Sequence, residues 1–290
     1  MSRNDIFRQA GWVLVLAGFL TGLTTLGVFT PAAFGAEGRW PFFAMDNGAG
    51  RGRWTPQEQA ATLKELGYDG ISYTYTNNLE LKERMEAFRQ AKLKIFALLF
   101  PARLDRPEGI DRDLVEAMRM LKGSDTILWL MYGCRYGQDD DTAVKLVRKV
   151  ADLAAQSNLR VALYPRAGTY VATAKDALRI VQEADRDNAG VTLNLGAELL
   201  ANNGNRLPEV VRTVGARLFV VTVNGADRPG GGGRYILPLV EGDFDVAGLL
   251  KTLHDSGYRG PIGLQGLRVP GDQKENLRRS MATWKEYQGN

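Results

Sequence analysis

Polar and aromatic side chains recur just after apolar stretches of the chain, at positions where they could bind or transform a small molecule. Nine of them stand out, namely Tyr75, Tyr132, Tyr164, Arg166, Asn194, Glu198, Asn224, Asp227 and Gln265. The apolar stretches before them have the length and composition of buried strands. If these strands run parallel, their carboxyl ends meet at one edge, where parallel α/β folds bind ligands.

Two carboxylates and one guanidinium among these residues could take part in proton transfer. Asp227 is the best-placed general base, although it could instead cap the glycine-rich loop that follows it. Glu198 is the other candidate base, although it could equally be the first-turn acid of the next segment. Arg166 could supply a fixed positive charge beside a carbonyl or a developing oxyanion, or it could form an ion pair across the site.

The remaining candidates are neutral and suit substrate binding. They are three amides, Asn194, Asn224 and Gln265, and three tyrosines, Tyr75, Tyr132 and Tyr164. Each amide offers a donor and an acceptor, which matches the vicinal hydroxyl groups of a sugar. Each tyrosine offers an apolar ring face with a polar tip. The sequence therefore predicts a site for a small carbohydrate.

The composition restricts the chemistry further. The chain has 290 residues and a formal net charge of +4, and its basic residues are scattered among acidic ones, so nucleic-acid binding is not expected. Its single cysteine, Cys134, can form no intrachain disulfide. Its single histidine, His254, falls late in a predicted helix, away from the strand ends, so imidazole chemistry at the site is not expected.

The first 36 residues have the pattern of an export signal peptide. Arg3 and Arg8 precede an apolar run over 12–29, and small residues at 31–36 could form a cleavage site. This pattern predicts an exported protein, periplasmic or extracellular. The alternative is an uncleaved N-terminal membrane anchor, because the run approaches the length needed to span a bilayer.

Strand and helix signals alternate over residues 37–290. The predicted strands are Trp40–Met45, Gly70–Thr74, Ile95–Phe100, Thr126–Met131, Val161–Tyr164, Val191–Leu195, Leu218–Val223 and Ile262–Leu264. The run Thr55-Pro56-Gln57-Glu58 is a strong helix start. Asp46, which ends the first strand, is a further candidate at the strand ends, although it could instead bond its own Asn-Gly turn. Eight strands alternating with eight helices, without a glycine-rich dinucleotide motif, favour a single (β/α)8 TIM barrel over an open sheet.

Three segments carry a resemblance to a known family. They are Tyr164-Pro165-Arg166, Asn194-Leu195-Gly196-Ala197 and the run from Gly260 to Gly266 with Gly271-Asp272 after it. With them the chain resembles the sugar phosphate isomerase/epimerase family, the xylose-isomerase-like TIM barrels, across nearly all of residues 37–290. The closest family members usually read YPH and NLCH at the first two segments. Here both histidines are replaced, by Arg166 and Ala197.

The resemblance implies a divalent metal site that this chain departs from. Metal-dependent sugar isomerases of this type hold a cation with Glu, Asp, His and Glu from strands five to eight. The matching positions here offer tyrosine or proline, then Asn194 with Ala197 beside it, and Gln265 on the last strand. Because neutral amides are weak ligands without carboxylate support, a Mn²⁺ or Mg²⁺ site is not expected.

Two functions follow from these residues and from the resemblance. The first is an exported isomerase or epimerase that acts on a sugar or keto-sugar by proton transfer, without the usual metal. The second is a catalytically inactive carbohydrate-binding barrel, because fold alone does not establish activity. Both have a small-molecule carbohydrate as partner, and the sequence does not predict an oligomeric state.

Overall fold

The computed structural model describes residues 39–102, 112–132, 139–228 and 233–289. The predicted export signal lies outside these residues and remains a prediction from sequence, and residues 229–232 of the glycine-rich loop also lie outside them. Residues 31–290 form one compact unit, which contains the whole fold. Within the described residues, no helix is long and apolar enough to span a membrane.

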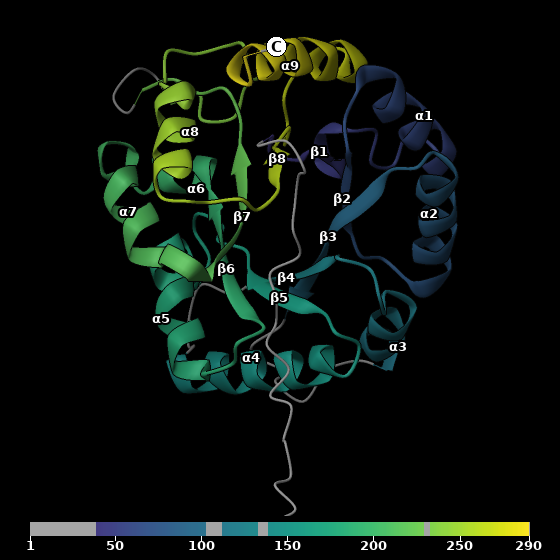
Figure 1. Ribbon diagram of the computed structural model, residues 1–290, viewed down its shortest axis with the longest axis vertical. Helices are drawn as coiled ribbons and strands as arrows, with labels where there is room; N and C mark the ends of the chain where they lie inside the picture. The colour runs from purple at the N-terminus through teal and green to yellow at the C-terminus, as the bar shows by residue number, and fades with distance from the viewer. Residues whose placement is uncertain (1–38, 103–111, 133–138, 229–232, 290) are drawn as a thin grey trace, which may run out of the picture. The chain divides into compact units, whose positions relative to one another are not determined.

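Eight parallel strands close into a barrel, as predicted (Figure 1). The strands are β1 Phe42–Met45, β2 Gly70–Thr74, β3 Lys94–Ala102, β4 Ile127–Tyr132, β5 Arg160–Leu163, β6 Ala189–Asn194, β7 Leu218–Val223 and β8 Ile262–Leu264. Each strand pairs with the next, and β8 pairs with β1, where Ala44 lies opposite Leu264. The closure brings all eight carboxyl ends to one end of the barrel.

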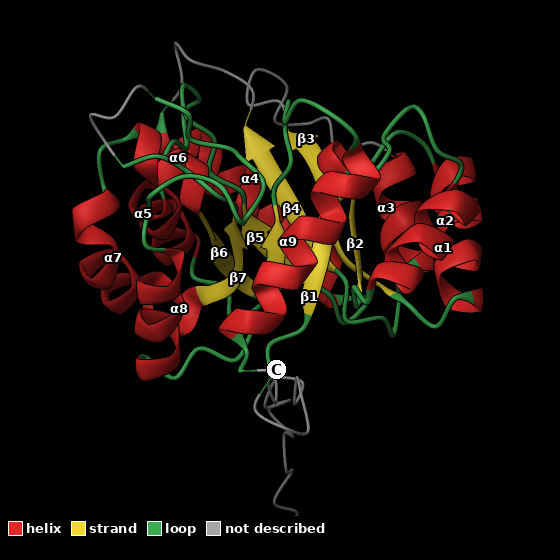
Figure 2. Cartoon of the chain, turned by 90° about the horizontal axis from the view of Figure 1, so that it is seen from above, coloured by secondary structure: helices red, strands yellow, loops and turns green. Residues whose placement is uncertain are grey.

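Helices surround the strands (Figures 1 and 2). They are α1 Pro56–Leu66, α2 Asn78–Gln90, α3 Arg112–Met120, α4 Asp140–Ala155, α5 Ala174–Ala184, α6 Leu195–Leu200, α7 Leu207–Val214, α8 Val246–Asp255 and α9 Gln273–Tyr287. The expectation of one helix after each strand is wrong at β6, which is followed first by the short α6 and then by α7. Helix α6 begins at the residue after β6 ends, so it lies at the carboxyl end of the barrel.

Local signals explain why the helices begin where they do. The Thr55 side chain accepts a hydrogen bond from Glu58 N, and the Glu58 carboxylate accepts one from Thr55 N, so the predicted capping box is confirmed. Asp139 caps α4 by accepting from Thr142 N. Helix α1 ends at Gly67, whose φ of 90° lies in the left-handed region that favours glycine.

Strand side chains alternate between two packed layers. The outer layer, between strands and helices, holds residues such as Ile71, Leu98 and Val221. The inner layer fills the barrel, and its apolar cluster consists of Phe43, Met45, Phe96, Ala97, Leu99, Ile127, Trp129, Ala162, Tyr164 and Val220. Because successive strand residues point to opposite faces, this division decides which side chains can reach the carboxyl-end opening.

Candidate functional site

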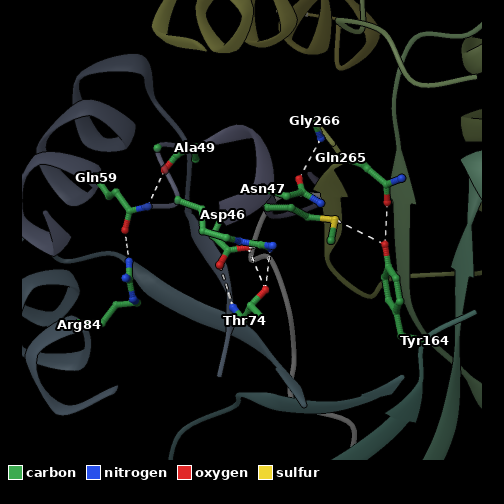
Figure 3. Close-up of polar contacts among 12 residues, drawn as sticks. Asp46, Asn47, Ala49, Gln59, Thr74, Arg84, Tyr164, Gln265 and Gly266 are labelled. Carbon is green, nitrogen blue, oxygen red and sulfur yellow. Dashed lines mark hydrogen bonds and ion pairs between the residues drawn. The ribbon is translucent and has the colours of Figure 1, made fainter. Parts of the chain in front are cut away.

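Three of the predicted binding residues meet in one hydrogen-bonded set at the carboxyl ends of β5, β6 and β8. The Tyr164 hydroxyl donates to Gln265 Oε1 at 2.6 Å (Figure 3). The same hydroxyl accepts from Asn194 Nδ2 at 3.1 Å. Tyr164 and Gln265 are 101 residues apart in the sequence. All three side chains are buried, so the set is held rigidly at the inner edge of the opening.

The position of Asn194 follows from the start of α6. Its side chain caps that helix, with Oδ1 accepting from Ala197 N at 3.4 Å. Its Nδ2 also donates to the Pro165 carbonyl at 3.0 Å. Asn194 therefore ties the loop after β5 to the first turn of α6.

Asn224, at the end of β7, is fully buried. Its Nδ2 donates to the carbonyls of Gly225 and Tyr235, at 2.8 and 2.7 Å, and so fastens the returning segment of the loop after β7. Its Oδ1 is buried and has no hydrogen-bond partner within the described residues. Asn224 lies on the same side of the barrel as Asn194 and Gln265, but its amide protons are already used.

The three predicted tyrosines point in different directions. Tyr164 points into the barrel and packs against Trp129, with ring centroids 4.8 Å apart, and burial raises the pKa of its hydroxyl. Tyr132 points outward beneath α4, where its hydroxyl donates to the Ala143 carbonyl at 3.2 Å. Tyr75 is half-buried, and its hydroxyl donates to Asn78 Oδ1 at 3.2 Å. The structure thus brings Tyr164 into the site and leaves Tyr132 apart from it.

Asp227 lies just beyond the end of β7 and is held by an arginine. Arg234 donates to it from both ends of the guanidinium, Nε to Oδ2 at 2.8 Å and a terminal nitrogen to Oδ1 at 3.0 Å. The Asp227 side chain is 11% exposed, whereas that of Arg234 is 63% exposed. The carboxylate is therefore neutralised from the solvent side, by a group that water can reach.

Glu198 is fully buried in α6. Its Oε1 accepts from Ala174 N, at the start of α5, and its Oε2 accepts from Asn203 Nδ2, both at 2.7 Å. Burial raises the pKa of this carboxyl group above its ordinary value of 4.5, and the two hydrogen bonds partly offset the rise. In this arrangement the side chain joins α6 to α5 and is separated from the opening.

Arg166 is exposed and reaches back over β4. Its guanidinium lies 4.0 Å from Met131 Sδ, and it forms no ion pair with any acid of the described residues. Its charge, with that of Arg51, acts to lower the pKa of Tyr164, although burial outweighs both. Arg166 is thus an unneutralised cation close to the hydrogen-bonded set.

Asp46, at the end of β1, forms polar contacts with Thr74 and Arg51. Asp46 is 2% exposed, and its Oδ2 accepts from Thr74 N at 2.9 Å, while Arg51 donates to its Oδ1 and to the Thr74 hydroxyl (Figure 3). The alternative that this side chain bonds its own turn is wrong, because it bridges the ends of β1 and β2 instead. Its position directly after a strand was the available signal, but its partner lies 28 residues away.

The residues at the ends of β5 to β8 do not fit a divalent cation. Tyr164, Asn194, Asn224 and Gln265 are neutral, and their oxygens accept internal hydrogen bonds or, for Asn224 Oδ1, lie buried. Hard cations such as Mg²⁺ or Mn²⁺ require carboxylate or imidazole support that these side chains lack. Across the described ranges, no group of three or more His, Cys, Asp or Glu residues could hold a metal ion.

The closed barrel of eight parallel strands, surrounded by helices, defines a TIM barrel. The family described as xylose isomerase-like TIM barrel matches residues 60–287, so the chain belongs to this family. No curated protein sequence matches the chain.

Several solved structures superpose on most of the chain at low sequence identity. The apo 3-keto-D-glucoside 4-epimerase of E. coli has a TM-score of 0.69 at 15% identity, covering 86% of this chain and 100% of that one. An AP endonuclease of family 2 from Brucella melitensis has a TM-score of 0.67 at 18% identity, covering 82% and 96%. The D-allulose 3-epimerase of Methylomonas sp. has a TM-score of 0.66 at 16% identity, covering 86% and 98%. At these identities the likeness shows a shared fold.

Proposed function

We propose that this chain binds a small carbohydrate at the carboxyl end of its barrel through neutral side chains. The observation that carries the proposal is the hydrogen-bonded set of Tyr164, Asn194 and Gln265, which gathers a phenol and two amides from three strands. Such groups exchange hydrogen bonds with sugar hydroxyls. Two of the superposed structures are named as sugar epimerases, which supports the same ligand class.

The proposal includes binding without a divalent cation. Its support is the chemistry of four side chains, Tyr164, Asn194, Asn224 and Gln265, which are neutral and accept or donate hydrogen bonds within the fold. A cation held by amides and a phenol alone would lack the negative charge that stabilises it. The sugar is then oriented by hydrogen bonds and by ring contacts.

Proton transfer on a keto-sugar is the second candidate function, and Asp227 favours it. A ligand that displaced the exposed Arg234 would free a carboxylate at the end of β7. That carboxylate would take a proton from the carbon beside the carbonyl, and the electron pair would move onto the carbonyl oxygen, where Arg166 would stabilise the charge. Return of the proton to the same or the neighbouring carbon would give an epimer or an isomer. Glu198 is a weaker candidate base, because both of its oxygens are bonded inside the fold.

The proposal also includes export, because the N-terminal sequence has the pattern of an export signal peptide. Arg3, Arg8 and the apolar run over 12–29 support it. A periplasmic or extracellular location would favour free sugars or oligosaccharide fragments as ligands.

The test combines carbohydrate binding with hydrogen exchange. The full-length chain is mixed with a panel of sugars and keto-sugars in D2O, with EDTA or with Mn²⁺, and C–H exchange is followed by proton NMR. In parallel, the rise in melting temperature with each sugar is measured. Asp227→Asn removes the candidate base, and Asp243→Asn, in the same loop, is the matched control.

Each outcome separates the candidates. A rise in melting temperature without exchange supports a binding protein. Exchange in EDTA that Asp227→Asn abolishes and Asp243→Asn preserves supports the epimerase. Exchange only with Mn²⁺ would contradict the metal-free site, and no thermal response to any sugar would overturn both functions.

A further inference from the structure

The first turn of α6 sets the direction of hydrogen bonding across the site. Asn194 Nδ2 donates to the Pro165 carbonyl, and Asn194 Oδ1 accepts from Ala197 N. A carbonyl oxygen only accepts and a backbone N–H only donates, so the Asn194 amide has a single orientation. Its Nδ2 therefore donates to the Tyr164 hydroxyl, which must direct its own proton elsewhere.

The Tyr164 hydroxyl in turn determines the orientation of the Gln265 amide. Its proton goes to Gln265 Oε1, at 2.6 Å, and not to the other acceptor within reach, Met45 Sδ, which is weaker and lies at 3.8 Å, so the amide of Gln265 turns Nε2 toward α6. A Cβ placed on Gly196 would lie 3.4 Å from this nitrogen, so the missing side chain at Gly196 leaves room beside it. Within the described part of the chain Nε2 makes no hydrogen bond, and Gln265 thus presents a donor.

The hydrogen-bond acceptors of the side chains near the carboxyl end of the barrel either accept bonds within the fold or are buried. Both carboxylate oxygens of Asp227, of Glu198 and of Asp46 accept hydrogen bonds within the fold. Asn224 Oδ1 is unpartnered among the described residues, but it is buried below the surface. A ligand that enters the opening therefore meets donors in preference to acceptors.

The charged side chains at the carboxyl end of the barrel carry a net positive charge. This charge favours the same kind of ligand as the free donor does, namely one that offers acceptors. Arg51 is neutralised by Asp46, and Arg234 is neutralised by Asp227. Arg166 has no acidic partner within the described ranges, and its guanidinium lies over Met131, whose side chain packs in the inner layer of the barrel. The net charge contributed by these residues is positive, and it is centred on Arg166.

From these donors we infer that the ligand is an acidic sugar, a polyhydroxylated molecule that carries a carboxylate. Arg166 binds the carboxylate, because a planar guanidinium matches its two oxygens with parallel hydrogen bonds. Gln265 Nε2 donates to a hydroxyl or carbonyl oxygen of the same molecule. The inference rests on the proposed carbohydrate site and narrows the class of ligand that it takes.

The test compares sugars that differ only in the acid group. Calorimetric titration of the full-length chain with D-glucuronate and D-glucose, and with D-galacturonate and D-galactose, measures the preference directly. A charge-assisted hydrogen bond in a partly exposed site should make the acid bind roughly tenfold more tightly. This preference should shrink as salt is added, because the charges are screened.

Variants assign the preference to Arg166. Arg166→Gln should bring the acid and the neutral sugar to equal affinity, and Arg166→Lys should keep part of the preference, because it keeps the charge but loses the planar fork. Arg212→Gln is the matched control, since Arg212 is an exposed arginine of α7 outside the site, and it should leave the preference unchanged.

The outcomes distinguish this inference from the proposed function. Equal binding of acidic and neutral sugars would overturn the inference and leave the carbohydrate site intact. A preference for the acid that survives Arg166→Gln would also overturn it, as would tighter binding of the matching sugar phosphates. If no sugar binds, the proposed function fails with it.

Discussion

The interior of the barrel has an apolar side and a polar side, and the two differ in the contacts that hold them together. The apolar side comprises Phe43, Met45, Phe96, Leu99 and Trp129, from β1, β3 and β4. The polar side comprises Tyr164, Thr192, Asn194, Thr222, Asn224 and Gln265, from β5 to β8 and the residues that follow them. The first side packs aromatic rings, and the second side holds a directed set of hydrogen bonds.

The polar side also carries unsatisfied groups. Of the five buried side-chain polar atoms without a partner in the described residues, Thr192 Oγ1, Thr222 Oγ1 and Asn224 Oδ1 lie on this side, and Trp129 Nε1 lies on the apolar side. Such groups cost free energy in a folded protein. The comparison teaches that one side of this barrel is held by the packing of rings and the other by hydrogen bonds between side chains.

The largest effect should come from the apolar side. Phe43 is fully buried and stacks on Phe96 with ring centroids 5.1 Å apart. Phe43→Ala should lower the free energy of unfolding by about 3–5 kcal/mol, measured by urea denaturation. Sugar affinity of the folded variant should be unchanged. Leu79→Ala, at a side chain that is 68% exposed, is the control and should have little effect. Loss of sugar affinity in Phe43→Ala would contradict the division into two sides.

The second largest effect on stability should come from Glu198, a buried polar residue that joins α6 to α5. Glu198→Ala leaves Ala174 N and the Asn203 amide without their acceptor and should lower the free energy of unfolding by about 2–3 kcal/mol. Glu198→Gln keeps one acceptor and should cost less.

The pH dependence of the Glu198 effect has a definite sign. Burial raises the pKa of Glu198 in the folded state, so the folded chain binds more protons than the unfolded chain above pH 4.5. The stability of the wild-type chain relative to Glu198→Gln should therefore be greatest at low pH and fall as the pH rises through the folded-state pKa. Urea denaturation at several pH values measures this difference. An increase with pH would show that the hydrogen bonds outweigh burial.

The smallest change in stability is expected at the two buried tyrosines, Tyr164 and Tyr132, which should differ in their effect on sugar binding. Tyr164→Phe removes the hydroxyl that joins Asn194 to Gln265, and Tyr132→Phe removes one that bonds the Ala143 carbonyl. Each should cost about 1–2 kcal/mol in thermal or urea unfolding. Calorimetry should show that only Tyr164→Phe weakens sugar binding, by about tenfold, because it releases the orientation of Gln265. Equal effects on affinity would place both tyrosines in one site and contradict the structure.

Much of the fold could be predicted because its signals are local. The strands Gly70–Thr74, Leu218–Val223 and Ile262–Leu264 have the predicted bounds. The predicted cap at Thr55 also holds, since a cap depends on residues three positions apart. Helix α6 was missed because its six residues are too few to show an apolar period.

The site could be predicted only in part. Tyr164 and Tyr132 both end apolar strands, yet one points inward and the other outward. Both faces of a strand in a closed parallel barrel are buried, so the sequence shows no alternation from which the direction of a side chain could be read. The candidate base Glu198 raises the same difficulty, because the packing of α5 against α6 supplies a hydrogen-bond partner that the sequence does not reveal.

The sequence by itself determined the alternation of strands and helices, the helix starts, the family resemblance and the replacement of both family histidines. These features depend on residue type and on short spacings along the chain. Only the tertiary structure decided that Tyr164 meets Gln265, that Asp46 bridges β1 and β2, and that Arg234 holds Asp227. These contacts depend on strand register and barrel closure, which join residues that are distant in the chain.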